Sequence, residues 1–117
     1  MHLIDEKPAP GLLDKIVSAV LTAFEVKEED LVSTSRLRVL ANPRHAIAAI
    51  AVLQFGFNRQ DVALRLNRDR STVYSSLNRV MGLHEYDKNF RVRLNEAWPG
   101  CHWEHKLKLA KQYGMRY

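Results

Sequence analysis

Hydrophobic residues along this chain recur every three or four positions, the spacing of helices that each bury one face. A first apolar stripe predicts a helix over 12–26 with the following residues on its buried side: Leu13, Ile16, Val17, Val20, Leu21 and Phe24. The segment 44–55 is apolar on nearly every side, as in a central, buried helix. Asn42 is its expected N-cap, Pro43 its expected first residue, and Gly56 its expected end.

Shorter apolar patterns complete an expected all-α helical bundle. Residues 27–32 form a turn or short helix that carries Leu31, and one further helix ends at Pro99–Gly100. A last, short amphipathic helix is expected from Trp103 onward. No segment alternates in the manner of a strand. We therefore expect an N-terminal loop over 1–11, a single domain over 12–98, and a basic, partly helical extension over 99–117.

Two short helices joined by a tight turn follow the central helix. Asn58 is the expected N-cap of the first, with Asp61 completing a capping box. Asn67 can adopt the left-handed conformation that ends this helix, and Asp69 can cap the next one. The second helix is expected to run to about Met81, before Gly82. This pattern predicts a helix-turn-helix.

The two faces of that second helix differ sharply in chemistry. Its core side is expected to hold Val73, Leu77, Val80 and Met81. Its outward side holds donors and almost no acids: Arg70, Ser71, Thr72, Tyr74, Ser75, Asn78 and Arg79. Side chains of these types read base edges and phosphates in DNA. Tyr74 could instead cover the helix surface, and Arg59 and Arg65 on the first helix could face phosphate or solvent.

The charge distribution supports a nucleic-acid partner for the same part of the chain. The net charge is +5, from 18 Lys and Arg against 13 Asp and Glu. Residues 1–30 carry three Lys and seven acids, a balance of −4, so residues 31–117 carry +9. That balance predicts neutralisation of roughly five to seven phosphates.

Other classes of function find little support. The single cysteine, Cys101, excludes an internal disulfide and a cysteine zinc cluster. His102, Glu104 and His105 have ligand spacing on a helix, but no second ligand cluster is evident, so no metal or other cofactor is expected. Catalytic pairs are also missing, so the protein is not expected to be an enzyme. No stretch approaches about 20 apolar residues, and a cytoplasmic, nucleoid-associated protein is expected.

Two motifs at matching spacing resemble the C-terminal DNA-binding domain of the bacterial chromosomal replication initiator DnaA. The first, Arg36–Ala48, is similar to that family's basic loop, Ala-Arg-Pro-Arg-Gln and apolar helix. The second, Arg68–Val73, is similar to Gly-Gly-Arg-Asp-His-Ser/Thr-Thr-Val. The resemblance covers Asp30–Trp98 and implies a helix-turn-helix bundle like that of the Trp repressor and DnaA. The helix at 12–26 and the tail at 99–117 are taken as additions.

The resemblance also implies roles for individual residues. Arg36, with Arg38 beside it, matches the arginine that enters the minor groove, and Arg44 matches a residue for phosphate contact or base readout. Asp69 helps to hold the motif, Ser71 and Thr72 approach the major groove, and Arg79 faces phosphate. The full set of expected DNA-binding residues is Arg36, Arg38, Arg44, His45, Arg68, Asp69, Arg70, Ser71, Thr72, Ser75 and Arg79.

The sequence departs from the family pattern in three places. Asn67 replaces two glycines and shortens the turn by one residue; Arg70 replaces a histidine and favours guanine; His45 replaces a glutamine. The 117 residues contain no Gly-x-x-x-x-Gly-Lys-Ser/Thr loop, so no nucleotide is expected to bind. We expect a stand-alone, sequence-specific double-stranded DNA-binding protein that regulates replication or transcription. The alternative is a protein-interaction module on this fold. A protein partner could use the acidic N-terminal helix or the C-terminal tail.

Overall fold

The computed structural model describes residues 10–34, 38–101 and 103–112. Within these ranges the chain forms helices and no strand, which confirms the expected all-α bundle. The elements are α1 (Pro10–Phe24), α2 (Glu28–Leu31), α3 (Arg38–Ala48), a π-helical continuation η1 (Ala49–Gln54), α4 (Arg59–Leu66), α5 (Arg70–Tyr86), α6 (Lys88–Ala97) and α7 (Trp103–Gln112). None of the described helices combines the length and apolarity needed to cross a bilayer.

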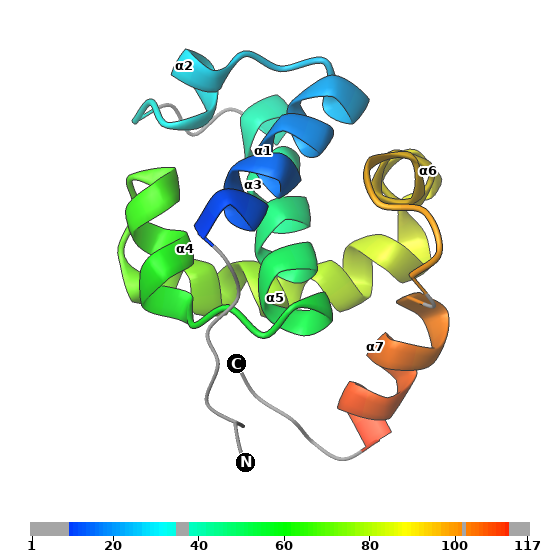
Figure 1. Cartoon of the computed structure of the whole chain (residues 1–117). Helices are drawn as coiled ribbons and strands as arrows, with labels where there is room; N and C mark the ends of the chain where they lie inside the picture. Colours follow the sequence, from blue (N-terminus) through cyan, green and yellow to red (C-terminus); the bar gives the residue numbers. More distant parts are fainter. Residues whose placement is uncertain (1–9, 35–37, 102, 113–117) are drawn as a thin grey trace.

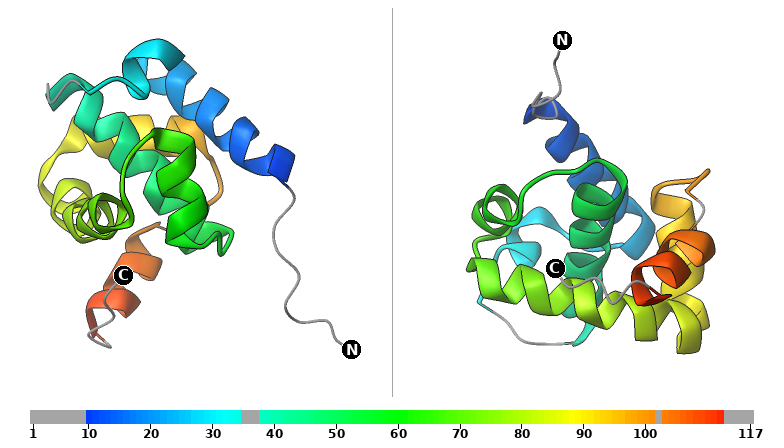
Figure 2. Two further views of the ribbon diagram at one scale, coloured as in Figure 1. Left: turned by 90° about the vertical axis from the view of Figure 1, so that its left-hand side faces the viewer. Right: turned by 90° about the horizontal axis from the view of Figure 1, so that it is seen from below.

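The continuous helix α3–η1 lies at the centre of the bundle, as its apolar sequence predicts (Figure 1). Every residue from Ala46 to Ala51 is fully buried. Helices α1 and α5 lie on opposite sides of this central helix (Figure 2). The α5 helix also packs against α4 and α6, and α1 packs against α6. The predicted helix-turn-helix, α4–α5, therefore packs on its inner side against the central, most buried helix of the domain.

The hydrophobic stripes pack as their spacing predicts. Val73, Leu77 and Val80 are buried on the inner side of α5, with Met81 half-buried beside them. Trp103, at 2% exposure, and Leu107 join the same core. The extension after residue 98 therefore packs onto the domain through α7.

Three predicted helix boundaries are wrong. The central helix begins at Arg38, so Pro43 lies inside it and Asn42 is not its N-cap. Leu40, 8% exposed, extends the buried face by one turn upstream, and this burial outweighs the backbone hydrogen bond that Pro43 cannot donate. At the N-terminus, α1 already begins at Pro10, within the expected loop of residues 1–11; residues 1–9 lie outside the described ranges.

The α5 helix continues past Gly82 to Tyr86. A glycine inside a helix costs only about 1 kcal/mol relative to alanine, which is too little to end a helix with a packed face. Leu83 continues that packing beyond the glycine. The helix instead ends where Asp87 adopts an extended conformation and accepts a hydrogen bond from the Phe90 amide, which begins α6.

Candidate nucleic-acid interface

The helix caps predicted at the turn of the helix-turn-helix are present, although the Asp61 carboxylate makes no hydrogen bond to the Asn58 amide that would complete the expected capping box. The Asn58 side chain accepts a hydrogen bond from the Asp61 amide at 2.8 Å and caps α4. Asn67 adopts the left-handed conformation, with φ 56° and ψ 46°, and ends α4. Asp69 is the N-cap of α5. These three residues set the angle at which α5 leaves α4.

The carboxylate of Asp69 organises the first turn of α5. Its Oδ1 accepts hydrogen bonds from Ser71 Oγ at 2.6 Å, Thr72 Oγ1 at 2.9 Å and the Thr72 amide at 2.9 Å. These donors, with the Ser71 hydroxyl first, lower the pKa of Asp69. Because both hydroxyl hydrogens point to Asp69, the oxygens of Ser71 and Thr72 are left to accept. Amino groups of adenine and cytosine are suitable donors in the major groove.

The outer face of α5 presents the remaining expected residues together. The residues exposed along its first half are Arg70, Ser71, Thr72, Ser75, Asn78 and Arg79. No acidic residue occurs in α5 before Glu85. Arg79 follows Arg70 by nine positions, about 13 Å along a helix, which is close to the width of the major groove.

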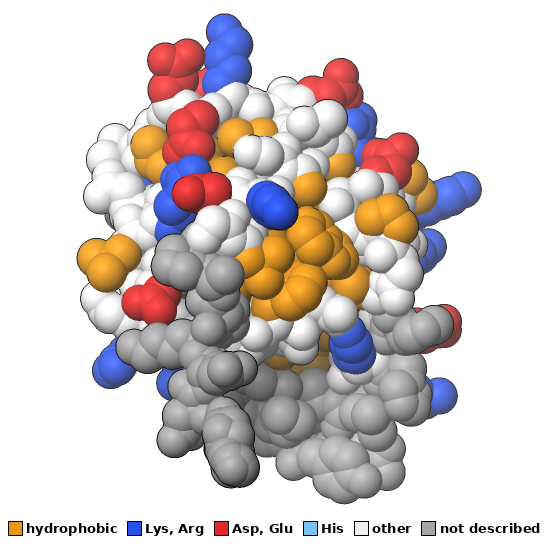
Figure 3. All heavy atoms as spheres, viewed as in Figure 1, with side chains coloured by type: hydrophobic (Ala, Val, Ile, Leu, Met, Phe, Trp, Pro, Cys, Tyr) orange, Lys and Arg blue, Asp and Glu red, His pale blue; other side chains and the backbone are white. Residues whose placement is uncertain are grey.

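Acidic side chains gather elsewhere. Seven of the 13 acidic residues belong to residues 1–30. On the face shown in Figure 3, acidic and basic side chains are interleaved towards the end of the molecule formed by α1 and α2. The α5 helix lies on the other side of α3 from α1 (Figure 2). Five of those seven acidic residues, Asp14, Glu25, Glu28, Glu29 and Asp30, lie in or beside α1 and α2.

Arg44, one of the residues expected to contact DNA, donates its guanidinium hydrogens to carbonyl oxygens of the protein. It is 7% exposed, and its guanidinium donates to the carbonyl oxygens of Leu31 at 2.7 Å, Asp30 at 3.1 Å and Ser33 at 3.1 Å. Burial, followed by the charge of Arg68, lowers the pKa of Arg44. A helix as short as α2 leaves carbonyls at its C-terminus without partners. Arg44 donates to the Leu31 carbonyl and adds to the hydrogen bonds that Ser33 already donates to the Asp30 carbonyl, so its guanidinium is engaged within the protein.

Arg68 and Asn67, in the turn between α4 and α5, also donate hydrogen bonds to the segment of residues 30–33. Arg68 donates to the carbonyl oxygen of Ser33 and, at 2.9 Å, to that of Asn67, while Asn67 Nδ2 donates to the Val32 carbonyl at 3.1 Å. Half-buried Arg68 is therefore also engaged within the protein. Together with Arg44, these bonds fix residues 30–33 to the turn between α4 and α5.

His45 connects the central helix to α5. Its Nδ1 lies 2.7 Å from Oγ of Ser76, a buried residue that the sequence analysis missed. Ser76 follows Val73 by three positions, and this core-side spacing is the signal that could have identified it. Burial, with smaller contributions from the charges of Arg79 and Arg44, lowers the pKa of His45 to about 4. The imidazole is neutral at pH 7 and helps to position α5.

The depressed pKa of His45 predicts an acid-labile domain. Between the folded value of about 4 and the ordinary value of 6.5, the unfolded chain binds more protons, so stability falls as the pH falls. Between pH 7 and pH 5 the expected loss is about 2 kcal/mol in the free energy of unfolding. His45→Gln should remove this part of the pH dependence, as measured by urea denaturation at both values. Equal pH dependence in the two proteins would contradict the prediction.

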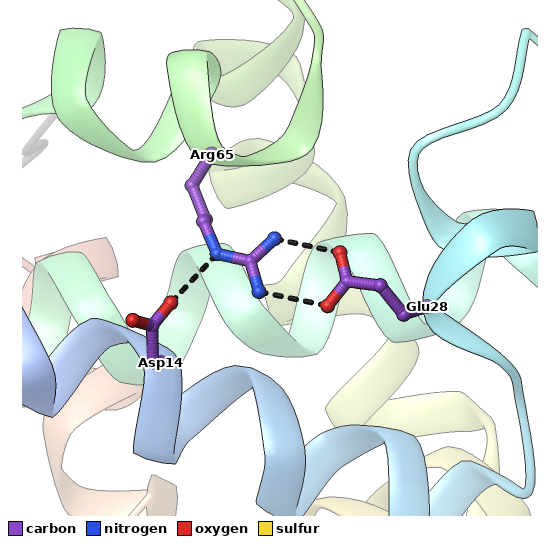
Figure 4. A network of polar contacts seen from close by, with 3 residues as sticks. All are labelled: Asp14, Glu28 and Arg65. Carbon is purple, nitrogen blue, oxygen red and sulfur yellow. Dashed lines mark hydrogen bonds and ion pairs between the residues drawn. The ribbon is translucent and has the colours of Figure 1, made fainter.

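Arg65 belongs to an ion-pair network within the protein. Its Nε lies 2.9 Å from an Asp14 oxygen, and its two terminal nitrogens each donate at 2.8 Å to the Glu28 carboxylate (Figure 4). The hydrogen bonds from Arg65 lower the pKa of Glu28. Arg65 therefore ties α4 to α1 and α2.

Two expected residues cannot be placed by side chain. Arg36 lies outside the described residues, and Arg38 begins α3 but its side chain is outside the described part. The side chains of His102 and His105, the histidines considered as metal ligands, are also outside the described part. Within the described ranges, no three His, Cys, Asp or Glu side chains are grouped to hold a metal ion.

A match to a protein-family model shows which family this chain belongs to. The model of the bacterial DnaA protein helix-turn-helix matches residues 13–80, which is more than half of the chain. The chain belongs to the DnaA helix-turn-helix family. The matched residues contain α4, the turn after it and α5 as far as Val80. Comparisons with curated proteins and with solved structures gave no match.

Membership in the DnaA family corrects one boundary of the expected resemblance. The matched range begins at Leu13, so α1 belongs to the family's domain and is not an addition to it. The match ends at Val80, so α6 and α7 lie beyond it. The DnaA C-terminal domain is a non-catalytic module that binds double-stranded DNA.

Proposed function

We propose that this protein binds specific sequences of double-stranded DNA by placing α5 in the major groove. The observation that carries the proposal is the outer face of α5, where exposed donors extend from Arg70 to Arg79 without an intervening acid. Membership in a family of DNA-binding domains supports it. By occupying its site, the protein would regulate replication or transcription.

The residues of α5 divide into base-reading and phosphate-binding groups. Arg70 stands at the first position of the helix, exposed and with no hydrogen bond or ion pair to any described residue. Its guanidinium can donate in bidentate geometry to O6 and N7 of guanine. Arg79 is equally free and lies further along α5, where it would contact phosphate. By the family resemblance, Arg36 and Arg38 would supply a minor-groove contact beside this site.

Replacing Arg70 tests the base-reading role. Arg70→Ala should cost about 1–3 kcal/mol in binding at one base pair and relax the preference for guanine there. Arg79→Ala should instead weaken binding to all sequences about equally. Binding of both variants to the selected duplex and its single-base-pair substitutions measures the difference. An unchanged sequence preference in Arg70→Ala would show that α5 enters the groove differently.

The proposal is tested most directly by selection from a random duplex library, followed by sequencing. The expected result is one enriched motif with a guanine in the part read by Arg70. No enrichment at low salt would overturn DNA recognition and favour the protein-interaction alternative. Mapping the bound motif in cells, together with origin copy number and transcript levels, would separate a replication role from a transcriptional one.

A further inference from the structure

Arg59 and Tyr74 form a contact between the two helices of the helix-turn-helix. Arg59 is the first residue of α4, and Tyr74 lies in the second turn of α5. The Arg59 guanidinium carbon lies 5.4 Å from the centre of the Tyr74 ring, so the cation sits over the ring face. Both side chains are partly exposed. The two side chains are therefore in contact and remain accessible to a ligand.

The other arginines show what is unusual about Arg59. The following arginines bind protein carbonyls or carboxylates: Arg44, Arg65, Arg68, Arg91 and Arg93. Among the side chains that the structure describes, Arg59, Arg70 and Arg79 donate to no protein acceptor. Arg70 and Arg79 lie on the proposed DNA-facing surface. Arg59 shares their unpaired state, although it belongs to α4.

Tyr74 places Arg59 at the edge of that surface. Arg70, Tyr74 and Asn78 are spaced by four residues and so follow one strip along α5. Arg70 and Asn78 are exposed on the face proposed to enter the groove. A guanidinium stacked on Tyr74 keeps its N–H edge free, and that edge matches two oxygens of a phosphate.

We infer that Arg59, held in place by the ring of Tyr74, is a preassembled contact for a backbone phosphate of duplex DNA on the α4 side of the recognition helix. The inference rests on the proposed function and adds a positioned phosphate contact to it. In this role Tyr74 is a positioning residue that acts through Arg59. Stacking restricts the long arginine side chain before DNA arrives, so less conformational freedom is lost on binding.

The experiment measures affinity for a specific duplex and for an unrelated duplex across a range of salt concentrations. Arg59→Ala should weaken binding to both duplexes by about the same factor and reduce the slope of log affinity against log salt by about 1 in magnitude. Lys15→Ala removes the same charge from an exposed position on α1 and should leave the slope unchanged. Circular dichroism melting checks that each variant folds.

Tyr74 is tested through a double-mutant cycle with Arg59. Tyr74→Phe keeps the ring and should bind like wild type, whereas Tyr74→Leu should weaken binding severalfold. In the Arg59→Ala background, Tyr74→Leu should have almost no further effect. Additive losses, or an unchanged salt slope in a folded Arg59→Ala protein that still binds DNA, would overturn the inferred phosphate contact of Arg59 and Tyr74. Either result would leave the proposed DNA binding by α5 intact. Failure of wild type to bind any duplex would overturn the proposed function and this inference with it.

Discussion

Arg44→Ala is expected to lower the free energy of unfolding by about 3 kcal/mol. The substitution removes hydrogen bonds to the carbonyl oxygens of Asp30, Leu31 and Ser33 and opens a space beneath α2. A buried acceptor left without a partner costs about 1–3 kcal/mol. Water that enters the space left by the side chain would offset part of this cost. Urea denaturation followed by circular dichroism measures the change.

Two further variants separate the structural role of Arg44 from its charge. Arg44→Lys keeps the charge, but a single ammonium group cannot span the three carbonyls, so it should also be destabilised. Arg70→Ala removes an exposed arginine of α5 and should change stability by less than about 0.5 kcal/mol. A stable Arg44→Ala protein that loses only DNA binding would restore the phosphate contact expected from the family resemblance.

The turn of the helix-turn-helix could be predicted because its determinants are local. Asn58 and Asp69 each cap a helix through an amide three residues away, and Asn67 needs only its own left-handed backbone. Interactions within three or four residues are specified by sequence order alone. The same reasoning holds for the buried side of α5, where helical spacing placed Val73, Leu77 and Val80 correctly.

The roles of the arginines could not be predicted in the same way. Arg44 and Arg65 bind partners 11 to 51 residues away, and an arginine that pairs inside the fold looks the same in sequence as one that contacts phosphate. Helix boundaries failed for a related reason: the packing of Leu40 and Leu83 overrode the local signals of Pro43 and Gly82. Tertiary burial decided each of these cases.

Binding to duplex DNA is expected to lose roughly a hundredfold in affinity between 50 and 200 mM salt, with a log–log slope of about −3 to −4. The +9 balance of residues 31–117 alone would predict five to seven neutralised phosphates. The structure argues for about four, because Arg44, Arg65 and Arg68 are engaged within the protein near the motif. Titrations of one duplex at several salt concentrations measure the slope.

The slope also distinguishes two descriptions of the interface. If the only cations that bind DNA are Arg59, Arg79 and the pair Arg36 and Arg38 proposed for the minor groove, then Arg79→Ala should reduce the slope by about 1 in magnitude. Lys15→Ala, which removes a charge from the exposed side of α1, should leave the slope unchanged. A slope beyond −6 would mean that a much larger basic surface binds DNA and that internal arginines are released on binding. A slope near zero would contradict an interface built on phosphate contacts.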